Sequence, residues 1–111
     1  MISLLAPRWF RLARQANYKA VTLARLLGMS LRQLERCFQE DIGRRPKDWL
    51  KVRRMVDARY LLLETNSIKE TSIKLTYRSP ANFARDFKKC YAMTPGEFLN
   101  RHRRMNNKVA F

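Results

Sequence analysis

The stretch SLRQLERCFQEDIGRRPKDWL at residues 30–50 returns 49 positions later as SPANFARDFKKCYAMTPGEFL at residues 79–99. Five positions are identical in the two copies, and the pairs are Ser30 with Ser79, Arg36 with Arg85, Phe38 with Phe87, Pro46 with Pro95 and Leu50 with Leu99. Upstream of this stretch the better offset is 48, so one copy carries an extra residue in its turn. A repeat of this kind indicates one supersecondary unit that is used twice.

The repeated unit is predicted to be helical, because proline and glycine punctuate it and no alternating strand pattern appears. In the first copy the expected helices cover about residues 7–16, 19–27 and 30–41. Gly28-Met29 makes the turn before the third helix. Ser30 and Gln33 are expected to form a capping box at its start, and Gly43 suits the left-handed conformation beyond its end.

The second copy repeats this order. Its expected helices cover about residues 67–75 and 79–90, with a last helix that starts at Thr94–Pro95. Ser67 and Glu70 predict a capping box. Ser79 is expected to cap a helix that begins at Pro80, where the missing N–H of proline costs nothing. Both copies therefore predict a helix-turn-helix unit.

Between the two capped helices lies the longest predicted helix, residues 46–65, which spans roughly 28 Å. Its apolar residues mark more than one side, with Trp49 and Val56 on one side and Leu50 and Leu62 on another. A helix that is apolar on several sides packs on several sides. We therefore expect a strut that touches both units, and the alternative is a helix within a single bundle core.

The predicted fold class is all-α, with about seven helices and two helix-turn-helix subdomains joined by a long linker helix. The expected division is residues 1–45 for the first subdomain, 46–65 for the linker helix and 66–111 for the second subdomain. A helical unit of about 50 residues buries little surface alone, so the two subdomains are expected to share packing.

The charge of the chain predicts a polyanionic partner. The 111 residues include 24 Lys and Arg against 9 Asp and Glu, a net charge of +15, while 46% hydrophobic residues exclude a disordered tail. Each phosphate that a basic side chain neutralises releases a counterion. No segment is long and apolar enough to span a membrane, and the first residues do not resemble a signal peptide. We expect a cytoplasmic protein that lies at the nucleoid.

The reactive side chains do not indicate a metal site, a cofactor or an enzyme. Cys37, Cys90 and His102 are too few for a disulfide framework or a four-ligand zinc site. Two thiols in a chain with no export signal suit a reducing cytoplasm. The sequence has no paired carboxylates in one motif, no nucleophile–base pair and no glycine-rich phosphate loop. We expect no enzyme activity, no metal and no cofactor.

A helical wheel divides each of the two longer capped helices into an inner and an outer face. Inward positions are predicted for Leu31, Leu34, Phe38 and Ile42 in the first helix and for Phe83, Phe87 and Tyr91 in the second. Arg36 and Arg85 therefore occupy equivalent outward positions on equivalent helices.

The outward faces suit the recognition of base pairs in a DNA major groove. Arginine bonds to O6 and N7 of guanine, asparagine or glutamine bonds to N6 and N7 of adenine, and a small side chain meets the thymine methyl. The candidate base contacts are Arg32, Gln33, Arg36, Ala81, Asn82 and Arg85. The candidate phosphate contacts are Ser30, Ser79, Arg78, Lys88 and Lys89. Unequal binding by the two units is expected, because lysines 88 and 89 replace an amide and an acid of the first copy.

In these residues the chain resembles the DNA-binding domain of the AraC/XylS family of bacterial transcription regulators. The first unit resembles it through Leu23-Ala24, Gly28, Ser30, Leu34, Arg36, Phe38, Gly43 and Pro46. The connector resembles the family's linker helix through Trp49-Leu50, Arg54, Ala58 and Leu61-Leu62. The second unit resembles it through Ile68, Tyr77, Ser79, Phe83, Arg85, Phe87-Lys88, Pro95 and Phe98. The likeness covers about residues 20–100.

This resemblance implies seven helices, two recognition helices (about residues 30–41 and 79–90) in successive major grooves of double-stranded DNA, and contact with RNA polymerase. Family members usually carry a separate sensor or dimerisation domain, which this chain does not contain. The chain departs from the family pattern at Ser72, Thr76, Ala92 and Leu99, where the family usually has alanine, glycine, glycine and arginine. Thr76 is the most serious departure, because glycine permits the turn geometry there.

The main alternative is a non-specific basic RNA-binding or nucleoid-associated protein. That class accounts for the charge, but it does not account for a repeated capped helix with a matched outward arginine. The function that we expect is therefore a sequence-specific regulator of transcription that binds double-stranded DNA.

Overall fold

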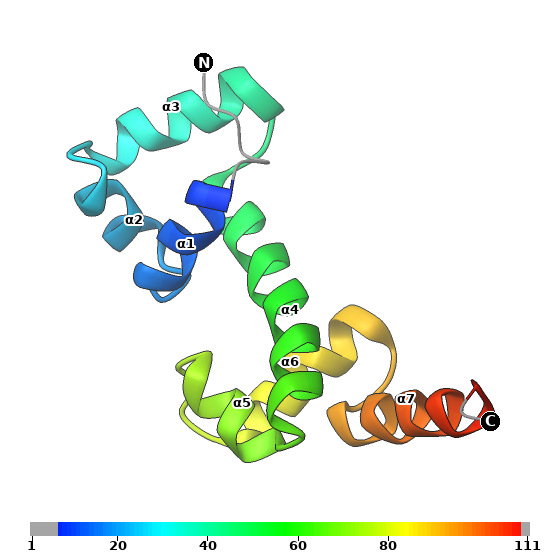
Figure 1. Cartoon of the computed structure of the whole chain (residues 1–111). Coiled ribbons are helices and arrows are strands. Elements are labelled where there is room, and N and C mark those ends of the chain that lie inside the picture. Colours follow the sequence, from blue (N-terminus) through cyan, green and yellow to red (C-terminus); the bar gives the residue numbers. More distant parts are fainter. Residues whose placement is uncertain (1–6, 110–111) are drawn as a thin grey trace. The chain divides into compact units, whose positions relative to one another are not determined.

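The computed structural model describes the backbone of residues 7–109 and the side chains of residues 7–105. Within this part of the chain every regular element is an α-helix (Figure 1). The helices are α1 (Pro7–Gln15), α2 (Ala20–Leu26), α3 (Leu31–Ile42), α4 (Pro46–Thr65), α5 (Ile68–Lys74), α6 (Pro80–Tyr91) and α7 (Pro95–Val109). The predicted all-α class and the seven helices are confirmed.

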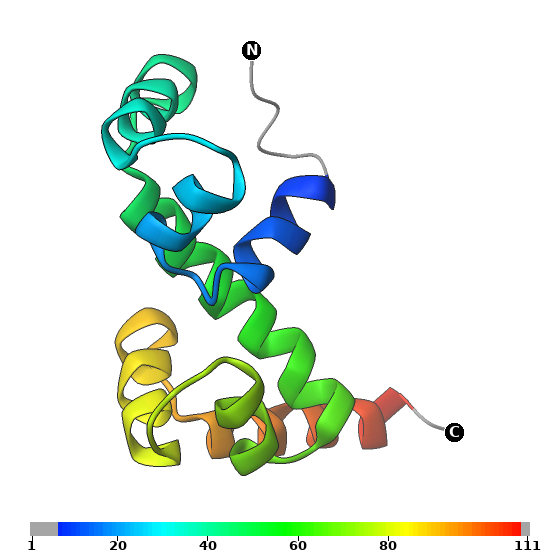
Figure 2. The ribbon, with the colours of Figure 1, turned by 90° about the vertical axis from the view of Figure 1, so that its left-hand side faces the viewer.

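The chain divides into two compact units. Unit 1 comprises the described residues up to Arg54, and it holds α1, α2, α3 and the first part of α4. Unit 2 starts at Met55, and it holds the rest of α4 together with α5, α6 and α7. Each unit contains a pair of helices joined by a short loop, α2 with α3 and α5 with α6 (Figure 2).

The core of unit 1 forms around Phe38 of α3. The ring of Phe38 is fully buried and meets two tryptophan rings edge-on, Trp9 of α1 at 6.2 Å and Trp49 of α4 at 5.7 Å between ring centroids. Such aromatic pairs add about 0.5–1.5 kcal/mol to the stabilisation from buried area. Leu23 of α2 and Leu34 of α3 are fully buried in the same cluster. Four helices therefore contribute to the packing that fixes the inner face of α3.

The core of unit 2 forms in the same way around Phe87 of α6. Its ring contacts those of Phe83 and of Phe98 on α7, each at 5.7 Å between centroids. Tyr77, in the turn before α6, reaches the ring of Phe83 at 5.4 Å. The predicted inward positions of Phe83 and Phe87 are confirmed by their full burial, and Tyr91 is half-buried.

Side-chain caps hold the starts of four helices. The capping oxygens belong to Ser30, Ser67, Ser79 and Thr94, and each accepts the N–H of the third following residue at 3.1 Å. At Ser30 the capping box is complete, because its own N–H donates to Oε1 of Gln33 at 2.9 Å. Losing such a cap costs about 1 kcal/mol. These four predicted helix starts are confirmed. The capping box predicted for Ser67 and Glu70 is incomplete, because the N–H of Ser67 donates to Oγ1 of Thr65 at 3.1 Å.

Leu31 and Ile42 differ from the wheel prediction, which placed them toward the core. They are 37% and 38% exposed, whereas Leu34 and Phe38 between them are fully buried. A wheel gives the side of a helix but not how far along the helix the core extends. Leu31 and Ile42 are the first and last residues of α3, so the core covers only the middle of that helix.

The turn between the paired helices and the end of the second helix adopt the left-handed conformation in both units, and only unit 1 has glycine at both positions. Gly28 and Gly43 have φ angles of 68° and 64°, while the equivalent Thr76 and Ala92 of unit 2 have φ angles of 63° and 58°. A side chain in this region costs roughly 1–2 kcal/mol, and a β-branched one is especially unfavourable. The two replacements therefore keep the geometry of the turns and place local strain in unit 2.

Replacing Thr76 by glycine should stabilise the chain by about 1 kcal/mol, because glycine adopts a positive φ without the clash of a Cβ atom. Ala92→Gly should also stabilise it, by about 0.5–1 kcal/mol, because alanine is not β-branched. Urea unfolding followed by circular dichroism measures both changes in the free energy of unfolding.

The matched control introduces a side chain at Gly28, the position of unit 1 that is equivalent to Thr76. A Cβ atom built on Gly28 meets no heavy atom within 4 Å, so Gly28→Ala tests the φ angle alone. This variant should lose about 1 kcal/mol of stability. If the free energy of unfolding of the Thr76→Gly protein is no higher than that of the parent, this turn of unit 2 is not strained.

Candidate nucleic-acid interface

The turns of the two helix pairs begin with equivalent backbone hydrogen bonds. The N–H of Met29 donates to the carbonyl of Ala24 at 2.9 Å, and the N–H of Tyr77 donates to that of Ser72 at the same distance. Ala24 and Ser72 are both buried. Ser72 stands where alanine is usual, but its hydroxyl donates to the carbonyl of Lys69 at 2.8 Å, so the buried oxygen has a partner. Both pairs are thus helix-turn-helix units.

The turn of unit 2 is one residue longer than that of unit 1. Two residues separate the C-cap Leu27 from the N-cap Ser30, whereas three separate the C-cap Leu75 from the N-cap Ser79. The added residue is Arg78, which is exposed. The predicted extra turn residue is therefore confirmed, and it places a cation directly before α6.

The outer face of α3 carries the candidate base contacts of unit 1. Arg32, Gln33 and Arg36 are all exposed, on the side of α3 away from Phe38. Gln33 is already engaged, because its Oε1 accepts the N–H of Ser30 in the capping box. A bidentate contact with adenine needs both the oxygen and the nitrogen of the amide, so Gln33 must leave the cap to make one.

The outer face of α6 carries the candidates of unit 2. Ala81 and Arg85 are exposed and Asn82 is half-buried. Nη2 of Arg85 donates to Oδ1 of Asn82 at 3.2 Å. This hydrogen bond restricts the guanidinium and leaves its other N–H groups free to donate. The arginine of unit 2 is therefore held by a neighbour on its own helix.

Gln33 and Asn82 occupy the same position in the two copies, 49 residues apart, but their amides have different partners. Gln33 bonds back to the helix start, whereas Asn82 bonds forward to Arg85. The shorter side chain of asparagine does not form the reciprocal cap bond at Ser79 in unit 2. The sequence did not predict this difference, because it depends on the side-chain conformations.

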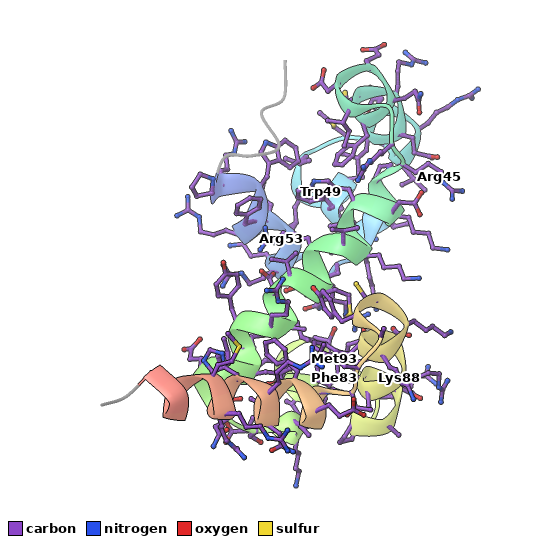
Figure 3. All side chains as sticks on the ribbon, turned by 90° about the vertical axis from the view of Figure 1, so that its right-hand side faces the viewer. Arg45, Trp49, Arg53, Phe83, Lys88 and Met93 are labelled. Atoms are coloured by element: carbon purple, nitrogen blue, oxygen red, sulfur yellow. The ribbon has the colours of Figure 1, made fainter. Side chains whose placement is uncertain are left out.

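The candidate phosphate contacts surround the starts and outer faces of the same two helices. Ser30 and Ser79 use a lone pair to cap their helices, which leaves each hydroxyl proton free to donate. Arg78, Lys88 and Lys89 are exposed. Figure 3 shows Lys88 on the outer side of α6, away from the buried Phe83.

A basic cluster at the turn between α3 and α4 was not among the predicted contacts. Arg44 and Lys47 are exposed there, and Nε of Arg45 (labelled in Figure 3) pairs with Oδ2 of Asp48 at 3.0 Å. The residues of unit 2 equivalent to the three basic ones are Met93, Thr94 and Gly96, which are uncharged. Unit 1 therefore has basic side chains beyond the end of α3, whereas unit 2 has them on α6 itself. The adjacent arginines Arg44 and Arg45 are the feature of the sequence that could have indicated this cluster.

Tyr91, at the C-terminal end of α6, belongs to the inner face. Its ring lies 4.7 Å from that of Phe87. Burial raises the pKa of the Tyr91 phenol, and the guanidinium of Arg59, 5.4 Å from the ring centroid, offsets part of that rise. The phenol is therefore neutral near pH 7 and contributes packing rather than charge.

Other kinds of site are not found in the described part of the chain. It contains no group of three or more His, Cys, Asp or Glu side chains that is placed to hold a metal ion. None of its helices combines the length and apolar character that crossing a membrane requires.

A family model described as a helix-turn-helix domain matches residues 23–101. The HTH-type transcriptional regulator GlxA of Rhizobium meliloti (strain 1021) is 38% identical over 80 residues, which are 71% of this chain and 25% of that protein. The F1 operon positive regulatory protein of Yersinia pestis is 39% identical over 72 residues, 64% of this chain and 24% of that protein. The chain spans about a quarter of the length of these curated relatives.

Two solved structures are similar to this fold. A transcriptional regulator of Chromobacterium violaceum, described as having an AraC-type DNA-binding domain, has a TM-score of 0.68 at 26% identity, covering 82% of this chain and 85% of that one. The C-terminal domain of AraT, a response regulator from Geobacillus stearothermophilus, has a TM-score of 0.68 at 27% identity, covering 89% and 88%.

The fold and its two exposed helix faces define a sequence-specific DNA-binding domain of the helix-turn-helix class. Within that class the chain belongs to the AraC/XylS family of transcription regulators. The resemblance drawn from the sequence is therefore confirmed.

The different partners of the two amides predict different effects on stability. Gln33→Ala removes one bond of the capping box and should lower the free energy of unfolding by about 0.5–1 kcal/mol. Asn82→Ala removes only a bond to an exposed arginine and should change it by less than about 0.5 kcal/mol. Urea unfolding of the two variants side by side measures the difference. Equal losses would show that Asn82, like Gln33, supports its helix start.

Proposed function

We propose that this chain regulates transcription by inserting α3 and α6 into successive major grooves of double-stranded DNA. The observation that carries the proposal is the matched pair Arg36 and Arg85. Both are exposed, and each lies two residues before a fully buried phenylalanine on its helix. Two residues correspond to about 200° around a helix, so burial of the phenylalanine points the arginine outward.

Direct readout is assigned to the outer faces of the two helices. Arg36 and Arg85 suit guanine, Asn82 suits adenine, and the small Ala81 suits a thymine methyl. Arg32 and Gln33 lie in the first turn of α3, where residues of a recognition helix reach base edges. These six positions are our proposed base contacts.

Phosphate binding is assigned to the serines and cations beside them. The hydroxyls of Ser30 and Ser79 are available as donors, and Arg78, Lys88 and Lys89 are exposed. The net charge of +15 supports an affinity that falls steeply with salt. Because Lys88 and Lys89 lie on α6 itself, we propose that unit 2 makes the stronger backbone contacts.

Residues 46–65 would act as the linker helix between subdomains at residues 1–45 and 66–111. As a 20-residue helix, α4 spans roughly 28 Å from its first to its last residue, which is close to the rise of one DNA turn, about 34 Å. This length supports one chain spanning two adjacent grooves. The difference between the length of α4 and the rise of one DNA turn is accommodated by bending the DNA, at a cost of order 1–6 kcal/mol.

The remaining proposals concern partners. The relatives that are named as transcriptional regulators, together with the family, support contact with RNA polymerase and a place at the nucleoid in the cytoplasm. The curated relatives are about four times as long as the matched region, which supports a sensor or dimerisation domain as a further partner. No catalytic activity is part of this proposal.

Selection of bound duplexes from a random pool tests the function. We expect one enriched site whose binding survives an excess of random RNA, because base contacts add about 4–10 kcal/mol over phosphate contacts alone. A hydroxyl-radical footprint on that site should show two protected stretches about 10 base pairs apart. Equal competition by RNA would favour a non-specific basic protein, and a footprint limited to one groove would contradict insertion of both helices.

Arg36→Ala and Arg85→Ala should each weaken binding to the selected site by about 1–3 kcal/mol and relax the preference at one base pair. Competition titrations with single-base variants of the site measure both effects. The control is Lys51→Ala, which removes one positive charge from an exposed position of α4. It should leave the base preference unchanged. An equal loss of affinity for every DNA sequence would show that the arginine contacts a phosphate and not a base.

A further inference from the structure

Unit 2 has an apolar groove that lies outside its helix-turn-helix pair. The groove has a volume of about 410 Å³ and is lined by residues of α4, α7 and the loop before α7. Tyr60, Leu63 and Met105 in its walls are 68%, 40% and 60% exposed. Exposed apolar surface of this kind, when it is gathered in one place, marks an interaction site more often than scattered apolar residues do.

The shape of the groove suits a third helix. On α4, Val56, Tyr60 and Leu63 follow one another at helical spacing, and on α7 Phe98 and Met105 do the same. Two ridges of side chains with a furrow between them accept the ridge of another helix. Packing of Phe98 against Phe87 anchors the start of α7, which forms one wall of the furrow.

Unit 1 has a cation–π contact at the equivalent place. The 48-residue offset applies to α2, whereas α1 matches the second half of α4 at an offset of 49, which pairs the buried Trp9 and Ala13 with the buried Ala58 and Leu62. At the same offset the first half of α4 matches α7. In unit 1 the guanidinium of Arg53 lies 4.1 Å from the ring centroid of Phe10, so a ring of α1 and a cation of α4 contact each other there.

Unit 2 has no cation–π contact between the equivalent residues. The residues equivalent to Phe10 and Arg53 are Arg59 and His102, and both line the groove. The guanidinium of Arg59 lies over the ring of Tyr91 instead, 5.4 Å from its centroid, and Arg101 and His102 can receive a carboxylate from outside.

The charges of the residues that line the groove indicate which kind of partner binds there. Arg59, Arg101 and His102 are among its lining residues, and none of the lining residues is acidic. A second copy of this chain is a poor occupant, because each copy has a net charge of +15. DNA is a poor occupant of apolar walls such as Leu63 and Met105. A surface that is apolar inside and basic at its edge matches an acidic amphipathic helix.

We propose that the α4–α7 groove binds an amphipathic helix of an acidic protein partner, with aromatic or leucine side chains against Tyr60, Leu63 and Met105 and carboxylates beside Arg101 and His102. None of the lining residues belongs to α5 or α6. This site is therefore separate from the proposed base and phosphate contacts of unit 2, and the proposal does not rest on DNA binding.

The methionines provide a direct test. Of the five in the chain, Met93 and Met105 line the groove, and Met29 lies in the turn of unit 1. The full chain with ¹³C-labelled methionine methyls is titrated with a helical peptide of about 16 residues. The peptide has leucine or phenylalanine at every third or fourth position and glutamate between them. A second peptide has lysine in place of every glutamate.

The acidic peptide should shift the methyl signals of Met93 and Met105 and leave that of Met29 in place, and the lysine peptide should shift none. Shifts centred on Met29, equal binding of both peptides or no shift at all would each overturn the proposal. Prior binding of the selected DNA should not displace the acidic peptide. Displacement would mean that the peptide occupies the DNA-binding faces, which also overturns it.

A pair of charge reversals separates the groove from general attraction. Arg101→Glu should weaken binding of the acidic peptide about fivefold or more, since it replaces an attraction by a repulsion. Arg104→Glu changes the net charge equally at an exposed position of α7 that does not line the groove. It should weaken binding less than about twofold. Equal effects would overturn the proposal, and thermal melts check that both variants are folded.

Discussion

Burial of one phenylalanine on α3 and one on α6 is the contact on which the proposed DNA interface depends. Phe38 and Phe87 are fully buried, and each is held by rings from neighbouring helices. Removing a buried aromatic side chain typically costs about 3–5 kcal/mol, which is a large share of the stability of a small domain. The same packing fixes the rotation of α3 and α6, so Arg36 and Arg85 face outward without further constraint. Core and interface are thus two sides of one helix.

The two units have the same backbone conformation at positions where their side chains differ. Thr76 and Ala92 adopt the left-handed φ angles that Gly28 and Gly43 adopt in unit 1, so tertiary packing overrides the local preference of the residue. Unit 2 also has the longer turn and the hydrogen bond that holds Arg85. Two copies of one architecture therefore present different chemistry, which suits a DNA site with two unlike halves.

Much of the fold follows from local rules that a sequence displays. Helix starts at Ser30 and Ser79 and the left-handed end at Gly43 depend on residues only a few positions apart. Exposure of Leu31 and Ile42 was not predictable in this way, because it depends on where the core of unit 1 ends. The bond between Asn82 and Arg85 depends on side-chain conformation, which a helical wheel does not contain. At the proposed interface, therefore, the exposure of Arg36 and Arg85 was predictable, and the hydrogen-bond partners of the side chains were not.

Comparison of the two copies also shows that the groove of unit 2 depends on its side chains and not on the fold that the two units share. In unit 1 the place beside its last helix holds a cation–π contact between Phe10 and Arg53. In unit 2 those positions are Arg59 and His102, and apolar side chains such as Tyr60 are exposed. Leaving that surface exposed forgoes roughly 25 cal/mol for each Å² that could be buried. Since Arg11 and Arg14 occupy the positions of unit 1 that Tyr60 and Leu63 occupy in unit 2, the apolar groove is a property of the residues of unit 2 and not a consequence of the architecture.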